Sequence, residues 1–260
     1  MNYSKHKNTP TPTLLVILAF VVSATLSSCS KNVAPRQGLV GEYLFKKNSN
    51  DQSTFQNHGA VHGATLTKGH TGKSKSAYHF NGSDQYIAIP DGVQDNFEHH
   101  QDFSISLWVA LDSVQNDLSA PLNDVMRKWR GDTQGYPFAI VYYNPTAPDT
   151  IQSRFSFVKY DGSICRDSPQ LFSTIHTGNS FVHIVCLKQG PLIKIYINGT
   201  LVSETTDTTR LGSACGSHNN AEITLGTRGN KKRFFTGKID DVRIYNRALT
   251  IEEISTLYKL

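Results

Sequence analysis

The chain has 260 residues, of which 26 are Lys or Arg and 21 are Asp or Glu, so its formal net charge is +5. Such a small charge, with no basic cluster longer than Lys231–Arg233, argues against nucleic acid as a partner. Thirteen Phe and eleven Tyr favour strands, and the length suffices for one sizeable all-β domain with a full core.

The first thirty residues have the pattern of an export signal. Lys5 and Lys7 precede an apolar stretch over residues 14–26, which is short and ends in small residues. The quartet Leu26–Cys29 resembles the lipobox of bacterial lipoproteins. The resemblance implies that residues 1–28 are removed, that Cys29 carries a lipid and that residues 29–37 tether the protein to the membrane at the cell envelope. The alternative is an ordinary signal peptide with a chance cysteine.

Three further cysteines are present. Cys165 and Cys215 lie in Gly/Ser-rich segments, so in an exported protein they are a candidate disulfide. Two free thiols are the alternative, because spacing alone cannot fix the geometry of a disulfide. Cys186 lies in an apolar segment and is expected to be a buried small hydrophobe.

Short strands with turns between them are predicted along most of the chain. The expected ranges are 38–45, 60–67, 77–80, 86–90, 103–111, 125–129, 138–143, 154–160, 181–188, 192–197, 200–202, 222–226 and 239–245. Residues 103–111 alternate strictly between large apolar residues and Ser, Trp or Ala, which indicates a sheet with one face on a core. Asn198-Gly199 is a strong hairpin signal. About a dozen short strands at this spacing predict a two-sheet sandwich or jelly roll.

The C-terminal segment combines a closing strand with a short helix. In residues 239–245, Val242 and Ile244 point to one face and polar side chains to the other. Thr250 and Glu253 then form a capping box, which marks the start of a helix. A last strand needs partners formed earlier in the chain, so this segment is expected to close the fold.

Several segments together resemble a known family. They are Gly38–Phe45, Asn57–Gly59, Ser76–Gly82, Phe103–Val109, Ile195–Gly199 and Gly237–Leu249. Over residues 38–260 the pattern is similar to the laminin-G-like, concanavalin A-like jelly roll of bacterial envelope proteins. The resemblance implies an all-β, two-sheet antiparallel sandwich with a short C-terminal helix, on a lectin-like scaffold that binds carbohydrate or protein. Phe181 departs from the family pattern, which usually has Trp there, and this changes packing rather than fold.

The resemblance also implies a structural calcium ion. The closing strand is similar to that of family 16 glucanases, in which the Asp three residues before the Arg binds calcium, and that position is Asp240 here. Calcium takes six to eight oxygen ligands, and Asp51 from the first loop is the expected partner. The alternative is that both aspartates cap turns and pair with Arg243 or Lys46.

Two classes of function remain open, a non-catalytic binding module and a hydrolase or lyase on the same fold. Glycosidases need two carboxylates about 5–9.5 Å apart. Relatives place them as Glu-x-Asp-x-x-Glu on one strand, and the chain has no such segment. The sequence signature of polysaccharide lyases with this fold is absent as well. The candidate acids are isolated in the sequence: Glu42, Glu98, Glu204 and Glu222. We therefore predict a binding module and no catalysis.

A binding site would use flat aromatic side chains and planar polar groups. The candidate ligand-binding residues are Trp129, Arg130, Tyr136, Tyr143 and Arg228. For each aromatic, packing in the core or on a sheet face is the alternative. The expected partner is a carbohydrate or an envelope or extracellular protein.

Overall fold

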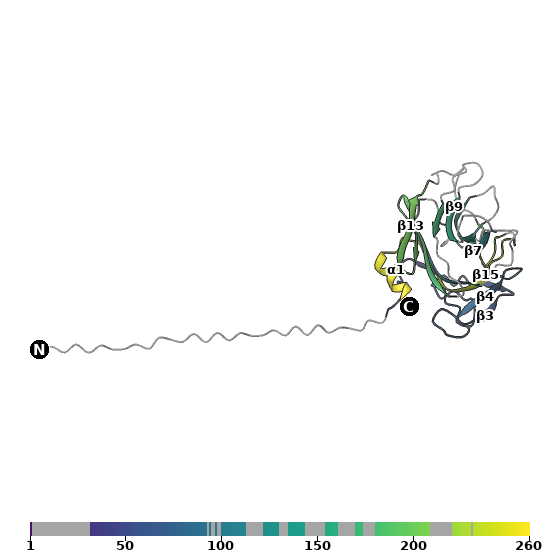
Figure 1. Ribbon diagram of the computed structural model, residues 1–260, viewed down its shortest axis with the longest axis horizontal. Coiled ribbons are helices and arrows are strands. Elements are labelled where there is room, and N and C mark those ends of the chain that lie inside the picture. The colour runs from purple at the N-terminus through teal and green to yellow at the C-terminus, as the bar shows by residue number, and fades with distance from the viewer. Residues whose placement is uncertain are drawn as a thin grey trace. The chain divides into compact units, whose positions relative to one another are not determined.

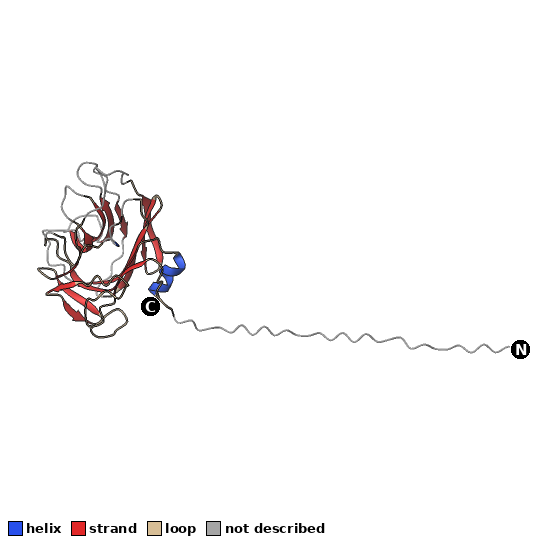
Figure 2. Ribbon diagram, turned by 180° about the vertical axis from the view of Figure 1, so that it is seen from behind, coloured by secondary structure: helices blue, strands red, loops and turns tan. Residues whose placement is uncertain are grey.

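The computed structural model describes residues 1, 32–92, 94, 97, 100–112, 122–129, 135–143, 154–160, 170–173, 180–208, 220–229 and 231–260. The chain divides into two units, residues 1–31 and 32–260, and the second contains all the strands and the helix described. Its described residues form fifteen strands and one helix (Figures 1 and 2). Within these ranges, no helix has both the length and the apolar composition needed to span a membrane. The predicted boundaries at residues 28 and 37 stay predictions.

The first sheet has eight antiparallel strands. In order across the sheet they are β13 (Thr200–Thr206), β12 (Leu192–Ile197), β11 (Val182–Gln189), β6 (Phe103–Leu111), β15 (Thr236–Tyr245), β4 (Ala77–Asn81) and β3 (Thr65–Thr67), and β1 (Leu39–Tyr43) also pairs with β15. The turn between β12 and β13 is Asn198-Gly199, and both residues have positive φ, 49° and 79°. This is the hairpin that the sequence predicts.

The second sheet has seven antiparallel strands. In order they are β10 (Gln170–Ser173), β9 (Arg154–Tyr160), β8 (Tyr136–Tyr143), β7 (Leu122–Lys128), β14 (Ile223–Leu225), β5 (Tyr86–Ile89) and β2 (Ala60–His62). Two antiparallel sheets and one short helix confirm the predicted sandwich. The final strand, β15, lies inside the first sheet, so the C-terminal segment does close the fold.

The main core lies between the two sheets. Every second residue of β6 enters it, from Phe103 to Leu111, as the alternation predicts. The second sheet supplies the facing layer, including Phe138, Ile140, Phe155 and Phe157. Each such side chain contributes about 1.5–3 kcal/mol on burial. Cys186 lies in the same core, 1% exposed, and burial raises the pKa of its thiol, so the expectation of a buried small hydrophobe is confirmed.

The closing strand changes partner along one edge. Residues 236–240 pair with β4 and residues 242–245 pair with β1, while β6 runs along the other edge. Between the two halves, Asp241 has φ 49° and the register against β6 shifts. The extra residue is a β-bulge, which lets one strand follow two neighbours in succession. Val242 and Ile244 face the core, as predicted.

Helix α1 (Ile251–Tyr258) covers part of the outer face of the first sheet. Thr250 and Glu253 form the predicted capping box, with each side chain accepting a hydrogen bond from the other residue's backbone N–H. Ile254 and Leu257 are fully buried in a second apolar cluster, which includes Val185, Leu187, Tyr196, Tyr245 and Leu249. The helix therefore seals a surface that the strands alone leave apolar.

One sequence prediction of a strand is wrong, and one strand was not predicted. The single strand expected over residues 60–67 is two strands in different sheets, because the chain crosses from β2 to β3 between His62 and Thr65. Strand β10 was not expected. Its four residues contain one apolar pair, Leu171-Phe172, which is too short to show a period.

Candidate functional site

The outward-pointing side chains of the second sheet form a face of aromatic, aliphatic and basic groups, which we call the β7–β10 face. On β8, the register shift between Tyr136 and Ala139 brings Tyr136 to the outside although Phe138 enters the core. On β9, Phe155 and Phe157 point inward, so Arg154 and every second residue after it point outward. Two adjacent strands thus supply one continuous surface.

A cavity of about 230 Å³ opens on this face. Its polar and aromatic lining comes from four strands and the segment before β15: Arg127, Tyr136, Tyr143, Arg154, Ser156, Gln170 and Arg233. The described lining residues include three arginines and no Asp or Glu. The floor is aliphatic, with Ala139, Val141 and Val158. A concave apolar surface with a few directed polar groups is the usual form of a small-ligand site.

Three aromatic rings on or beside this face each have a guanidinium group stacked on them. The pairs, with the distance from guanidinium carbon to ring centre, are Arg127–Tyr136 at 4.3 Å, Arg154–Tyr143 at 5.0 Å and Arg228–Trp129 at 4.0 Å. Each contact contributes about 0.5–1 kcal/mol at exposed sites and more when desolvated. The stacking fixes the orientation of both partners, so the planar groups are held in place before any ligand arrives.

Arg127 carries the most buried of these charges. Arg127 is 5% exposed, and its Nη1 donates a hydrogen bond to Asp124 Oδ1 at 2.9 Å. Asp124 itself is fully buried. A buried charge is tolerable only when it is paired, so Asp124 is required for Arg127 to lie there. The Arg127 Nε has no hydrogen-bond partner among the described residues. Burial raises the pKa of the Tyr136 hydroxyl, and the nearby Arg127 opposes the shift.

Trp129 and Arg228 meet because two segments approach closely. A Cβ atom at Gly229 would lie 2.6 Å from the backbone oxygen of Trp129, so only glycine allows this approach. Trp129 also packs against the cluster of Tyr136, Ala139 and Val141. The end of β7 and the segment after β14 therefore join the same face.

The structure brings four predicted ligand-binding residues together on this face: Trp129, Tyr136, Tyr143 and Arg228. Arg130 lies outside the described residues, as do Cys29, Cys165 and Cys215. Sequence reasoning missed Arg127, Arg154 and Arg233. The alternation around Phe155 and Phe157 contained the signal that would have placed Arg154 outside.

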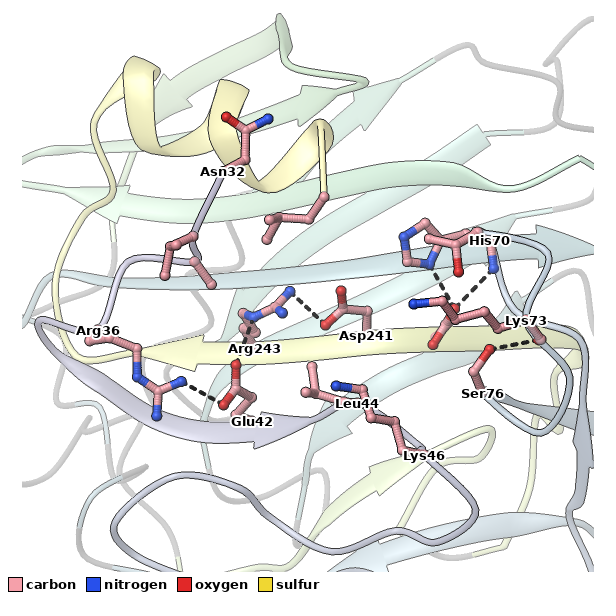
Figure 3. Close-up of a pocket in the computed structure, with 15 residues that line it drawn as sticks. Asn32, Arg36, Glu42, Leu44, Lys46, His70, Lys73, Ser76, Asp241 and Arg243 are labelled. Atoms are coloured by element: carbon pink, nitrogen blue, oxygen red, sulfur yellow. Dashed lines mark hydrogen bonds and ion pairs between the residues drawn. The ribbon is translucent and has the colours of Figure 1, made fainter. Parts of the chain in front are cut away.

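A larger cavity, of about 410 Å³, lies on the other sheet beside β1 and β15 (Figure 3). Four of its charged groups form a chain of ion pairs. Arg36 bonds to Glu42 at 2.7 Å, Glu42 to Arg243 at 3.2 Å, and Arg243 to Asp241 at 2.5 Å. Burial works against the charge of Arg243, but Asp241 and Glu42 raise its pKa and keep it ionised. This chain of ion pairs fastens the segment before β1 to the closing strand.

Asp240, the first predicted calcium ligand, lines this second cavity. Its Oδ2 accepts a hydrogen bond from the backbone N–H of His70 at 2.9 Å and lies 2.7 Å from His70 Nδ1 (Figure 3). Arg243 pairs with Asp241 and Glu42 rather than with Asp240 in the contacts described. Asp240 therefore holds the loop before β4 against β15.

Asp51, the second predicted ligand, is 3% exposed and organises its own loop. Its Oδ1 accepts from the backbone N–H groups of Glu42 and Ser53, and its Oδ2 from the N–H of Asn57 and the hydroxyl of Ser53. A carboxylate offers about four such positions, so the donors leave little room for a cation. The loop around Asp51 therefore agrees with the alternative in which this aspartate caps a turn.

In the part of the chain described, no group of three His, Cys, Asp or Glu could hold a metal. Calcium at Asp240 stays a prediction.

Three of the four isolated acids of the sequence lie in the described part of the chain, and each of these three forms an ion pair with a Lys or Arg. Glu204 lies 3.4 Å from Lys194 and Glu222 lies 2.9 Å from Lys231, whereas Glu42 joins the chain already described. Glu98 lies outside the described residues. None of these three described carboxylates lines the cavity of the β7–β10 face.

The chain is similar to one protein family and to several solved structures. A family model described as the concanavalin A-like lectin/glucanases superfamily matches residues 81–255. No curated protein matches the sequence. Similar solved structures include the binding domain of Paraclostridial mosquitocidal protein 1 (18% identity, TM-score 0.67, covering 86% of this chain and 52% of that one) and the receptor-binding domain of botulinum neurotoxin D (16%, 0.62, 86% and 53%). Another is domain 4 of an extracellular arabinanase from Geobacillus stearothermophilus in complex with arabinotriose (22%, 0.60, 85% and 98%). The chain spans about half the length of these toxin domains.

Proposed function

The chain belongs to the concanavalin A-like lectin/glucanase superfamily, and on that premise we propose that it is a non-catalytic module that binds carbohydrate on its β7–β10 face. The observation that carries the proposal is the set of stacked arginine and aromatic side chains around a cavity of about 230 Å³. The proposal includes an envelope location through a lipid on Cys29, which the lipobox-like quartet Leu26–Cys29 supports.

A carbohydrate suits this face chemically. Sugar rings have apolar C–H surfaces that pack on aromatic and aliphatic groups, and hydroxyls that accept hydrogen bonds from planar donors. Tyr143, Arg154 and Gln170 supply both kinds of contact around an aliphatic floor. A related domain of similar length, the arabinanase domain, was solved with arabinotriose.

The charges around the site favour binding over catalysis. Glycosidase chemistry needs a pair of carboxylates at a set separation. The described residues that line the cavity offer none. Asp124, behind the lining, is fully buried against Arg127 and so is unsuited to move a proton to a substrate.

The test is a glycan array probed with the purified protein, followed by assays for released reducing ends and for unsaturated products on every glycan bound. Binding without turnover is the expected result. Turnover of any glycan would overturn the non-catalytic assignment. Binding to no glycan would overturn the carbohydrate assignment and favour a protein partner on the same face.

A further inference from the structure

Four exposed lysines lie on two neighbouring loops of the first sheet. Lys46 and Lys47 follow β1, whereas Lys73 and Lys75 belong to the loop between β3 and β4. The backbone N–H of Lys47 donates a hydrogen bond to the backbone oxygen of Lys75 at 2.9 Å, so the two loops are in contact. We call these four residues the basic patch.

No acidic side chain in the described part of the chain pairs with the basic patch. None of the four lysines takes part in an ion pair with a described residue. Between residues 43 and 83 the only acidic residue is Asp51, which is 3% exposed. Its carboxylate already accepts hydrogen bonds from backbone and hydroxyl donors around its own loop. The two loops therefore present positive charge to the surroundings.

The basic patch borders the cavity of about 410 Å³ on the outer face of the first sheet. Lys46 and Lys73 line this cavity, and so do residues 32–34, with which the domain begins. Figure 3 shows Asn32 and the two lysines around the same cavity. The segment that leads to the domain and the basic patch thus share one side of the molecule.

The proposed lipid lies very close to this side in the sequence. Cys29 precedes Asn32 by three residues. Three residues span at most about 11 Å when fully extended. This reach is about the distance over which exposed charges interact at physiological salt, roughly 8–10 Å. A lipid on Cys29 therefore keeps the rim of this cavity near the headgroups of the membrane that holds it.

We infer that the basic patch docks on anionic phospholipid headgroups of that membrane and orients the domain. Clusters of lysine beside a membrane anchor are attracted to anionic lipids. The acyl chains supply the attachment, and the lysines select which side of the domain faces the lipid.

This orientation has a consequence for the glycan site. The outer faces of two sheets packed face to face point in opposite directions. The β7–β10 face belongs to the second sheet, so docking through the first sheet turns the β7–β10 face away from the membrane. The inference rests on the lipid on Cys29 in the proposed function, but it is independent of which ligand the β7–β10 face binds.

The test measures lysine accessibility on the acylated protein. The protein is produced from its full sequence in a bacterial host, purified in detergent and weighed by mass spectrometry to detect acyl chains on Cys29. It is then inserted into preformed vesicles of phosphatidylcholine, either alone or mixed with phosphatidylglycerol. A membrane-impermeant acetylating reagent modifies exposed amines, and peptide mass spectrometry gives the rate at each lysine.

The four lysines should react about fivefold or more slowly on the mixed vesicles than on phosphatidylcholine, which is the factor expected for one lysine at an anionic surface. High salt should remove the difference, because it screens the attraction. Lys232 is the internal control, since it is exposed and lies between β14 and β15 beside the second sheet. It should react at the same rate on both kinds of vesicle.

Paired substitutions separate the basic patch from general attraction of a basic protein. Lys46→Gln combined with Lys75→Gln leaves Lys73 as the reporter, and Lys73 should lose most of its protection. Lys231→Gln combined with Lys232→Gln removes the same charge elsewhere and should leave the protection of Lys73 unchanged. Melting temperatures confirm that both double variants fold.

Several results would overturn the inference: equal rates on the two kinds of vesicle, equal protection of Lys232, protection that persists at high salt, or an equal loss in the two double variants. If the purified protein carries no acyl chain, the inference fails together with the proposed envelope location. The glycan array is a separate measurement, so the carbohydrate assignment stands or falls on its own result.

Discussion

Arg154 and Tyr143 stand directly opposite each other on adjacent strands, and the guanidinium carbon of Arg154 lies 5.0 Å from the centre of the Tyr143 ring. Cross-strand pairs of this kind stabilise a sheet by about 0.2–1 kcal/mol. Here the pair also lines a cavity, so one contact both stabilises the sheet and orients two side chains at that cavity.

Removing the ring should weaken binding without unfolding the domain. We expect Tyr143→Ala to lower the affinity for any bound glycan about tenfold, which is about 1.4 kcal/mol. Isothermal titration measures the change. Tyr258→Ala is the matched control, since Tyr258 is 39% exposed on helix α1 at the other sheet. Equal losses in the two variants would contradict a site on the β7–β10 face.

The buried pair Asp124–Arg127 makes a prediction about stability. We expect Asp124→Ala to reduce the free energy of unfolding by about 3–5 kcal/mol, because it leaves a buried guanidinium without its carboxylate. Urea unfolding measures this. The double variant Asp124→Ala with Arg127→Met removes both charges and should recover part of the loss. A double variant as unstable as the single one would contradict this cause.

Loss of the capping box of helix α1 is expected to reduce stability less than loss of Asp124 does. We expect Thr250→Ala to lower the free energy of unfolding by about 1 kcal/mol, since the backbone N–H of Glu253 loses its acceptor. Thr250→Ser keeps a hydroxyl at the same place and should change stability little. The two variants are compared by denaturant unfolding, and an equal loss in both would point to packing of the Thr250 methyl instead.

His183 predicts how stability depends on pH. Burial lowers its pKa from 6.5 to about 3, and Arg243 and His70 add to the shift. Between these pH values the unfolded chain binds a proton that the folded protein does not, so stability falls as pH falls from 6.5 toward 3. We expect His183→Gln to have a flatter profile in this window, measured by urea unfolding across pH. An unchanged slope would show that His183 is not the group responsible.

A substitution at Asp240 distinguishes an anchoring role in the loop from calcium binding. From loop anchoring alone, in which Oδ2 meets two nitrogens of His70, we expect Asp240→Ala to lower the melting temperature equally in calcium and in chelator. Differential scanning fluorimetry in the two buffers decides between the roles. A decrease confined to the calcium buffer would support the calcium site that the family resemblance implies.

Local patterns in the sequence predicted most individual elements. Strict alternation in residues 103–111 predicted β6 and its core face, Asn198-Gly199 predicted the hairpin, and Thr250 with Glu253 predicted the helix start. These features depend on neighbouring residues alone, because side-chain direction, turn geometry and caps are set within a few positions.

The site could be predicted only in part. Residue type alone marks four side chains as candidates, and the structure places them on one face: Trp129, Tyr136, Tyr143 and Arg228. The arginines that complete the face, Arg127, Arg154 and Arg233, come from strands and segments that only pairing brings together. Their chemistry was visible in the sequence, but their proximity was not.

By itself the sequence determined most of the strands, the hairpin, the helix and the class of fold, since each follows from local periodicity and turn chemistry. The tertiary structure alone decided that residues 60–67 divide between two sheets and that Asp241 sits in a bulge. It also decided that Tyr136 faces outward beside Arg127. The physical reason is that a strand's partners and register are set by distant segments, and a one-residue shift exchanges the two faces of a strand.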